Sequence, residues 1–212
     1  MEQDYLDKRV QRSRSAIKQK FIELLQAKPF EQITISQIAR ETNYNRGTFY
    51  ANFHSTEDLL KEIITETLNE MIIQIKYPYK SIKKVNIRKL PTADITLFKY
   101  FKDNSSLYKL LLSDHIRVDF RHQMSKAIED LFLAEYEYEL PEDSELEPKW
   151  LYIYRANGIA GFIIRLIEED FPTSPEYMAK QIVELMLVST ETFFLKEWLD
   201  VMMTYLIDIL DM

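Results

Sequence analysis

Residues 34–45, "TISQIARETNYN", constrain the fold most, because they place two helix starts and one tight turn within a very short stretch. Thr34 and Gln37 have the T-x-x-Q spacing of a capping box, which predicts that a helix begins at Ile35. Asn43 is, after glycine, the residue that best adopts the left-handed backbone of a tight helix-to-helix turn. Asn45 is a favourable N-cap for the next helix. The pattern therefore predicts two short helices joined by a turn of about three residues.

The second of these helices contains Gly47, one of only three glycines in the chain. A glycine inside a helix costs about 1 kcal/mol relative to alanine, so the missing side chain needs a reason. In a helix-turn-helix reader the N-terminal part of the second helix enters the major groove. A Cβ that faced the DNA backbone or a base edge would hold the helix out, and glycine permits the close approach. Gly47 thus indicates DNA as the partner.

Helical periodicity extends over most of the remaining chain. Three glycines and seven prolines are too few for a turn-rich sheet protein, so the sequence predicts an all-α fold. Two short predicted helices begin at Ile35 and after the N-cap Asn45. The other predicted helices cover residues 7–28, 55–76, 92–103, 105–113, 114–138, 148–170, and 174 to the C-terminus with a possible break near Ser189. We expect a helix-turn-helix domain over residues 1–54, a connecting helix over 55–76, and a larger helical domain over 77–212.

Charge is distributed unevenly along a chain whose net charge is −7. Residues 1–54 hold nine Lys and Arg against six Asp and Glu, a net +3, and the rest of the chain carries −10. Six basic residues and no acidic residue lie between positions 8 and 22. A basic head on an acidic body can bind a polyanion locally, although a solvated basic helix face gives the same pattern.

Several functional classes are not supported by the sequence. No cysteine is present, and no apolar run approaches the roughly 18 residues of a membrane span, so we expect a cytoplasmic protein without a membrane partner. His115 and His122 would stand about 10.5 Å apart on one helix, too far for one zinc ion. We find no nucleophile with a base, no metal cluster and no phosphate-binding glycine loop. The sequence therefore predicts neither an enzyme nor a cofactor.

The stretch "TISQIARETNYNRGTFYANFHSTEDLL" resembles the DNA-binding signature of the tetracycline-repressor (TetR) family of regulators. The matching residues, in register, are Thr34, Ile38, Ala39, Gly47, Tyr50, Phe53 and Leu59. The resemblance implies a homodimer that recognises an inverted repeat in double-stranded DNA. It also implies a variable helical domain that binds a small apolar or amphipathic effector, which weakens DNA binding.

The chain departs from this family pattern at a few positions. Thr42 and Asn43 stand where the turn usually carries Ala-Gly, and Tyr44 stands where an aliphatic residue is usual. Asn52 replaces a common aromatic residue or histidine. Thr56 replaces a lysine that grips phosphate, which should remove about one phosphate contact per subunit.

Arg46 is the strongest candidate for base readout, because bidentate arginine on guanine is the commonest specific contact. A phosphate-bound or solvent-exposed Arg46 is the alternative. Asn45 could cap the helix, read adenine, or do both, and Tyr50 could contact phosphate or be structural. The candidate DNA-binding residues are Thr34, Asn45, Arg46, Gly47, Thr48, Tyr50, Asn52, Lys18 and Arg14.

Aromatic residues crowd the second half of the chain, and some of them could line a ligand pocket rather than fill the core. The candidate pocket residues are Phe98, Phe101, Tyr108, Phe120, Tyr154, Arg155 and Phe162. Gly158 and Gly161 leave a flat strip that suits close helix contact between subunits, or equally packing within one chain. The candidate dimer-interface residues are Gly158, Gly161, Ile182, Leu185 and Met186.

These observations predict a sequence-specific transcriptional regulator, in which a small molecule releases a repressor from a palindromic operator. The alternative is an effector-independent dimeric DNA-binding protein that acts structurally or through a protein partner. An enclosed cavity in the helical domain would separate the two hypotheses.

Overall fold

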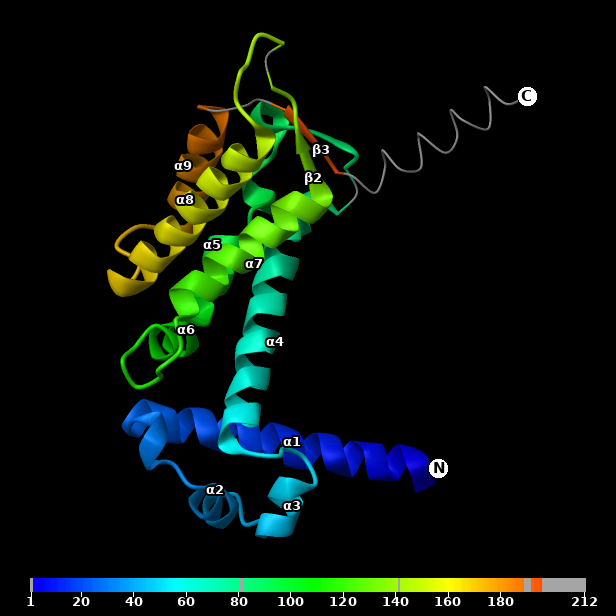
Figure 1. Cartoon of the computed structure of the whole chain (residues 1–212), viewed down its shortest axis with the longest axis vertical. Coiled ribbons are helices and arrows are strands. Elements are labelled where there is room, and N and C mark those ends of the chain that lie inside the picture. Colours follow the sequence, from blue (N-terminus) through cyan, green and yellow to red (C-terminus); the bar gives the residue numbers. More distant parts are fainter. Residues whose placement is uncertain (1, 81, 141, 189–191, 196–212) are drawn as a thin grey trace, which may run out of the picture. The chain divides into compact units, whose positions relative to one another are not determined.

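A computed structural model describes residues 2–80, 82–140, 142–188 and 192–195 (Figure 1). Within these residues the chain forms nine α-helices and three very short β-strands, so the predicted helical fold is confirmed. The helices are α1 (Glu2–Ala27), α2 (Ile35–Glu41), α3 (Arg46–Tyr50), α4 (Thr56–Lys76), α5 (Leu97–Asp103), α6 (Ser105–Leu111), α7 (Phe120–Glu135), α8 (Pro148–Glu168) and α9 (Pro175–Leu187). The strands are β1 (Lys84–Asn86), β2 (Tyr136–Tyr138) and β3 (Thr192–Leu195).

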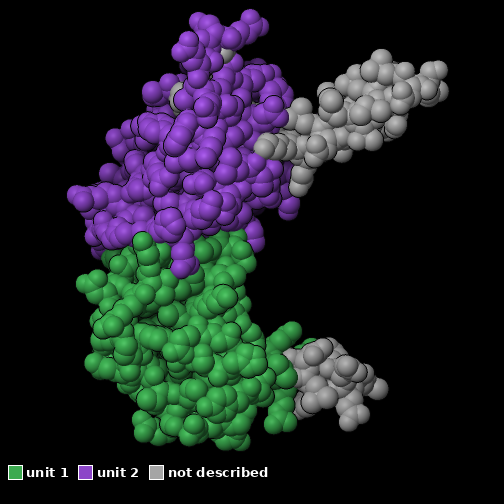
Figure 2. Space-filling view, viewed as in Figure 1, with its two compact units in different colours: residues 1–69, 106–120 green, residues 70–105, 121–212 purple. Residues whose placement is uncertain are grey.

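The chain divides into two compact units (Figure 2). The first unit contains residues 1–69 and 106–120, and the second contains residues 70–105 and 121–212. Helix α4 contributes to both units, and a segment from the middle of the chain joins the N-terminal helices. The domain limits at residues 54 and 77 stay a prediction.

The core of the first unit comes from one face of each of its helices. Helix α2 contacts both α1 and α3. The largest fully buried side chains here are aromatic or branched, and Phe49 and Phe53 lie with their ring centroids 5.9 Å apart. The fully buried set includes Ile17, Phe21, Leu25, Ile38, Phe49, Phe53 and Leu59.

Residues 113–117 belong to the first unit and contact residues 25–31 within it. The amide of Phe30 donates to the carbonyl of His115 at 2.9 Å, and Nδ1 of His115 donates to the carbonyl of Leu25 at 2.7 Å. Arg117 pairs with Glu31 at 2.8 Å. The carbonyl of His115 accepts from Phe30 and not from an amide of its own segment, and the helix predicted from residue 114 begins only at Phe120.

The second unit combines helices with a small antiparallel sheet of strand order β1-β3-β2. Helix α5 contacts both α8 and α9. Val85 of β1 and Tyr138 of β2 both pair with Phe193 in the central strand. The prediction of helix to the C-terminus is wrong at β3, where "TFFL" has the β-branched and aromatic residues that favour a strand. Ser189, the predicted break, lies outside the described residues.

Candidate nucleic-acid interface

The turn between α2 and α3 has the predicted left-handed residue. Asn43 has φ of 56°, and its amide donates to the carbonyl of Arg40 at 3.2 Å. The next amide, that of Tyr44, donates to the carbonyl of Ala39 at 2.9 Å. At the other end of α2, the hydroxyl of Thr34 accepts from the amide of Gln37 at 3.2 Å. Hydrogen bonds between residues close in sequence therefore form the turn and the helix start that the sequence predicted.

Asn45 is the N-cap of α3, and its role constrains the glycine two residues later. Its Oδ1 accepts from the Thr48 amide at 2.8 Å and lies 3.2 Å from the Thr48 hydroxyl. A Cβ built on Gly47 would come within 3.1 Å of the same Oδ1. The glycine thus leaves room for the cap, a structural reason that adds to the proposed close approach to DNA.

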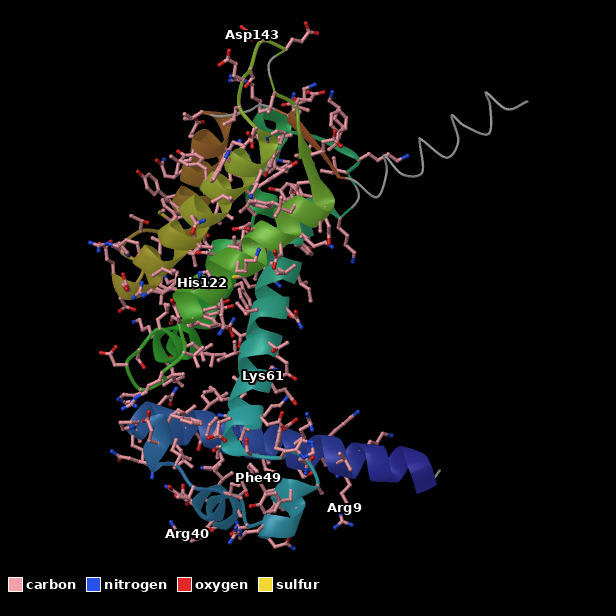
Figure 3. The ribbon with its side chains drawn as sticks, in the orientation of Figure 1. Arg9, Arg40, Phe49, Lys61, His122 and Asp143 are labelled. Carbon is pink, nitrogen blue, oxygen red and sulfur yellow. The ribbon has the colours of Figure 1, made fainter. Side chains whose placement is uncertain are left out.

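The remaining side chains of α3 separate onto a buried and an exposed face. Phe49 is fully buried and lies on the side of α3 that faces α1 (Figure 3). Asn45, Arg46 and Gly47 are exposed, and Tyr50 is 48% exposed. The Arg46 guanidinium lies 6.0 Å from the Tyr50 ring centroid, with Nη2 3.4 Å from its hydroxyl. An arginine and a phenol are therefore presented together to solvent.

Arg14 and Asn52, two predicted DNA contacts, face into the unit. The side-chain Nδ2 of Asn52 donates to the Ser13 hydroxyl at 3.2 Å and to the Thr48 carbonyl at 2.7 Å. Arg14 donates to the Asn52 carbonyl at 2.7 Å and stacks 4.4 Å from the Phe53 ring centroid. The guanidinium also binds the carboxylate of Glu62 through two nitrogens. These side chains fix the end of α3 against α1 and α4.

Lys18, the other basic residue of α1 predicted to contact DNA, also pairs within the unit. Its ammonium lies 2.5 Å from Glu62 and 2.6 Å from Glu66, and its side chain is only 17% exposed. Burial disfavours ionisation of Glu62, but hydrogen bonds from Lys18 and Arg14 outweigh it and lower the pKa of that carboxyl. Sequence charge alone could not reveal this, because the acidic partners lie some 48 positions away.

Two other basic residues of α1 do remain available. Arg9 and Arg12 are exposed, and neither has an ion pair or hydrogen bond within the described part of the chain. Figure 3 shows Arg9 projecting from α1 on the side where α3 lies. Ser13, one turn further along α1, contacts Asn52 just after α3, which supports that placement. Arg9 was not singled out from sequence, and its helical spacing from Ser13 was the available signal.

The seven residues predicted for a ligand pocket lie in different places. Tyr108 and Phe120 are buried in the first unit, with ring centroids 6.1 Å apart. Phe98 and Phe101 are buried in the second unit, where Phe98 packs edge-to-face on Phe162. Tyr154 is 71% exposed on α8. These aromatic residues fill cores or face solvent, and the seventh residue, Arg155, lies beside a cavity.

The second unit contains a small cavity of about 40 Å³. Its wall is mostly apolar, and the polar groups on it are one amide and three phenols. The lining residues are Gln74, Ile75, Pro78, Tyr79, Ile95, Leu97, Phe132, Tyr136, Tyr138, Ile159, Ile182 and Met186. Two predicted dimer residues, Ile182 and Met186, thus face inward, whereas the aromatic residues predicted for the pocket are absent from this lining.

The other predicted dimer residues are on the surface of α8 and α9. Gly158 and Gly161 are exposed, and a Cβ built on either meets no described atom within 4 Å. Trp150 and Tyr154 continue the same helical face, 56% and 71% exposed. On α9, Leu185 is 53% exposed and Val188, directly after the helix, is 84% exposed. An apolar strip with two flat positions is therefore open to solvent.

Metal clusters and membrane-spanning helices are both absent from the described residues. They contain no group of three or more His, Cys, Asp or Glu side chains placed to hold a metal ion. Likewise, no helix among them combines the length and apolar character that a membrane crossing needs.

Two family models match the chain, one in each half. Residues 22–63 match the model described as bacterial regulatory proteins of the tetR family. Residues 93–187 match a model described as a transcriptional regulator C-terminal region. The chain is also 25% identical, over 185 residues, to the uncharacterised HTH-type transcriptional regulator YxbF of Bacillus subtilis (strain 168). That match covers 85% of this chain and 46% of YxbF, so the chain spans about half of that relative.

Solved structures share the fold at lower identity. A TetR transcriptional regulator from Streptococcus agalactiae 2603V is 21% identical with a TM-score of 0.58, covering 85% of this chain and 97% of that one. The dihydroxyacetone kinase operon activator DhaS is 24% identical with a TM-score of 0.56, covering 83% and 94%. The helical architecture, the capped helix–turn–helix and both family models agree. The chain belongs to the TetR family of transcriptional regulators, which bind DNA and are not enzymes.

Proposed function

We propose that this protein is a cytoplasmic, homodimeric repressor that leaves an inverted-repeat operator when a small molecule binds its second unit. The observation that carries the proposal is the exposed face of α3, where a capped, glycine-containing helix start presents Arg46 and Tyr50 to solvent. An α-helix N-terminus that carries arginine fits the major groove and the guanine edge.

The residues of the first unit take different roles in this proposal. We assign base readout to Arg46 and phosphate contacts to Thr34, Asn45, Thr48 and Tyr50. Gly47 allows the helix to approach the groove, and Arg9 supplies a phosphate contact beside it. The inward residues hold the reading helix in place, which positions the base contacts without touching DNA; they are Arg14, Lys18 and Asn52.

The dimer in this proposal forms through the exposed strip on α8 and α9. Gly158 and Gly161 allow two α8 helices to approach closely, and Trp150 and Tyr154, nearer the start of α8 on the same face, bury apolar area. Two subunits held this way give the two reading heads that a palindrome requires.

The effector and the sense of regulation are the finer parts of the proposal. A cavity of about 40 Å³ in the second unit offers a place from which a ligand can act. Since that volume is far below the roughly 300–1,000 Å³ of drug-sized sites, the effector is small or widens the cavity on entry. A dimer that binds DNA regardless of small molecules is the second candidate, which the small cavity volume favours.

Selection from a random duplex library, followed by a mobility-shift assay, tests the DNA-binding part. We expect an enriched inverted repeat, bound with a slope of log K against log salt of about −5 to −9 for about 6 to 10 phosphate contacts per dimer. Equal binding to a scrambled duplex, or a flat salt response, would overturn the proposal.

A further inference from the structure

Arg40, near the end of α2, presents its guanidinium to solvent. Its side chain is 77% exposed, and it pairs with the carboxylate of Glu41 at 3.8 Å, which is too long for a hydrogen bond. Oε1 of Glu41 instead accepts from Nε2 of Gln37 at 3.0 Å. The guanidinium of Arg40 therefore keeps its hydrogen-bond donors for a partner outside the chain.

This arginine lies beside the start of α3, the reading helix. The carbonyl of Arg40 accepts from the amide of Asn43, the left-handed residue of the turn, at 3.2 Å. Two residues later, Asn45 caps α3. The tight turn therefore fixes Arg40 close to the N-terminal end of α3.

Arg9 lies beside the opposite end of α3. The hydroxyl of Ser13 binds the side chain of Asn52, two residues after the helix, at 3.2 Å. Arg9 precedes Ser13 by four positions on α1, so the two residues share a face of that helix. In Figure 3 Arg9 and Arg40 are seen on opposite sides of α3, and both are drawn away from α4. The two arginines thus lie on either side of the reading helix.

The dimensions of the major groove fit this arrangement. Helix α3 has five residues and is about 7.5 Å long, whereas the groove is about 12 Å wide. Long side chains beyond both ends of so short a helix reach past it to the borders of the groove. One strand of the duplex borders each side, and the helix before a reading helix crosses the backbone. In this protein the preceding helix is α2, which carries Arg40.

We propose that Arg9 and Arg40 bind phosphates on opposite strands of the duplex, one at each border of the major groove that α3 enters. The two contacts together fix the position of α3 across the groove, and with it the base that Arg46 meets. Phosphates carry no sequence information, so this arginine pair acts on every duplex alike. The assignment rests on the proposed function, since it states how the reading helix is held on DNA.

Methylphosphonate substitution in the selected operator locates each contact, because a methylphosphonate is neutral where a phosphate is charged. Each phosphate of one half-site, on both strands, is replaced in turn, and affinity is measured for the wild type, Arg9→Ala and Arg40→Ala. Neutralising a contacted phosphate should weaken the wild type several-fold and should not weaken the variant that lacks the matching arginine. We expect the position that becomes insensitive in Arg9→Ala to lie on one strand, and that in Arg40→Ala to lie on the other.

Salt dependence provides a second readout. Arg40→Ala should lower the slope of log K against log salt by about two per dimer, and Arg40→Lys should retain most of it. Lys61→Ala is the matched control, because Lys61 is an exposed cation of the first unit that lies on α4, away from α3 (Figure 3). It should change neither the slope nor the methylphosphonate pattern. Insensitive positions on the same strand for both arginines, or a wild-type slope in Arg40→Ala, would overturn the assignment.

A random duplex separates the arginine pair from the proposed function. If the wild type binds operator and random duplex alike, sequence-specific regulation fails. The arginine pair is then supported if both alanine variants lower the salt slope on the random duplex, and it is overturned if they do not. If the wild type selects an inverted repeat but Arg40→Ala binds it with an unchanged slope, the function stands and the arginine pair fails.

Discussion

Asn45 and Gly47 depend on each other within the first turn of α3. Glycine costs the helix about 1 kcal/mol of propensity, but a Cβ would crowd the capping oxygen at 3.1 Å. We predict that Gly47→Ala stabilises the fold less in the wild type than in an Asn45→Ala background, with a coupling of at least about 0.5 kcal/mol. Urea denaturation of the two single variants and the double variant measures this. Additive changes would mean that the cap accommodates the methyl group.

Arg46 should determine sequence preference at one base pair in each half-site. We predict that Arg46→Ala weakens operator binding by about 1 to 3 kcal/mol and relaxes the preference at that pair. Binding to the operator and to each single-base variant provides the measurement. Arg165→Ala, in the second unit, is the control and should leave both quantities unchanged. An unaltered base preference in Arg46→Ala would assign the readout to another residue.

Arg9 should contribute affinity without sequence preference. Since it is exposed beside α3, we predict that Arg9→Ala weakens binding to all duplexes alike and lowers the salt slope by about one per subunit, or about two per dimer. Arg9→Lys should retain most of the slope. Lys20→Ala is the control and should leave the slope unchanged, because Lys20 pairs with Glu23 on the same helix.

At the level of the helices, the carboxylate of Glu62 on α4 binds two basic residues of α1. Glu62 accepts from Arg14 and Lys18, and Arg14 in turn holds the carbonyl of Asn52 after α3. The reading helix is therefore oriented by a network that spans three helices. We therefore expect Arg14 and Lys18 to act on DNA binding only through the position of α3.

The lowered pKa of Glu62 gives this network a defined pH dependence. A depressed folded pKa contributes stability above the unfolded value of about 4.5, and that contribution is lost as pH falls through the lower folded value. We predict that Glu62→Gln costs about 1 kcal/mol at pH 7 and little below pH 4. Urea midpoints at both pH values measure the difference. A cost that is equal at both would show that the charge of Glu62 is not the stabilising feature.

For the whole molecule, we expect that a substitution which prevents dimerisation also weakens DNA binding. We predict that Gly161→Arg, which places a charge on the flat strip of α8, gives a monomer by sedimentation at micromolar concentration. Its salt slope on the operator should fall to about half, because one reading head remains. Lys61→Glu, on the exposed face of α4, should leave the dimer intact. A dimeric Gly161→Arg protein would place the interface elsewhere.

Features that short-range interactions control could be predicted from the amino-acid sequence. The caps at Thr34 and Asn45 and the left-handed Asn43 follow from side chains bonding to backbone within three residues, so local spacing predicted them correctly. The helical class followed in the same way from periodicity and from the scarcity of glycine. Family resemblance added the DNA-binding role, which both family models support.

Contacts between residues far apart in the sequence could not be predicted, because they depend on how the helices and strands pack. Lys18 and Arg14 were predicted to contact DNA, but both pair with Glu62 of α4. His115, in a segment predicted to be helical, bonds to Leu25 and Phe30. The cavity formed where β2, placed by pairing with β3, brought tyrosines to Arg155. Each of these contacts joins residues tens of positions apart, so a short stretch of sequence never contains both partners.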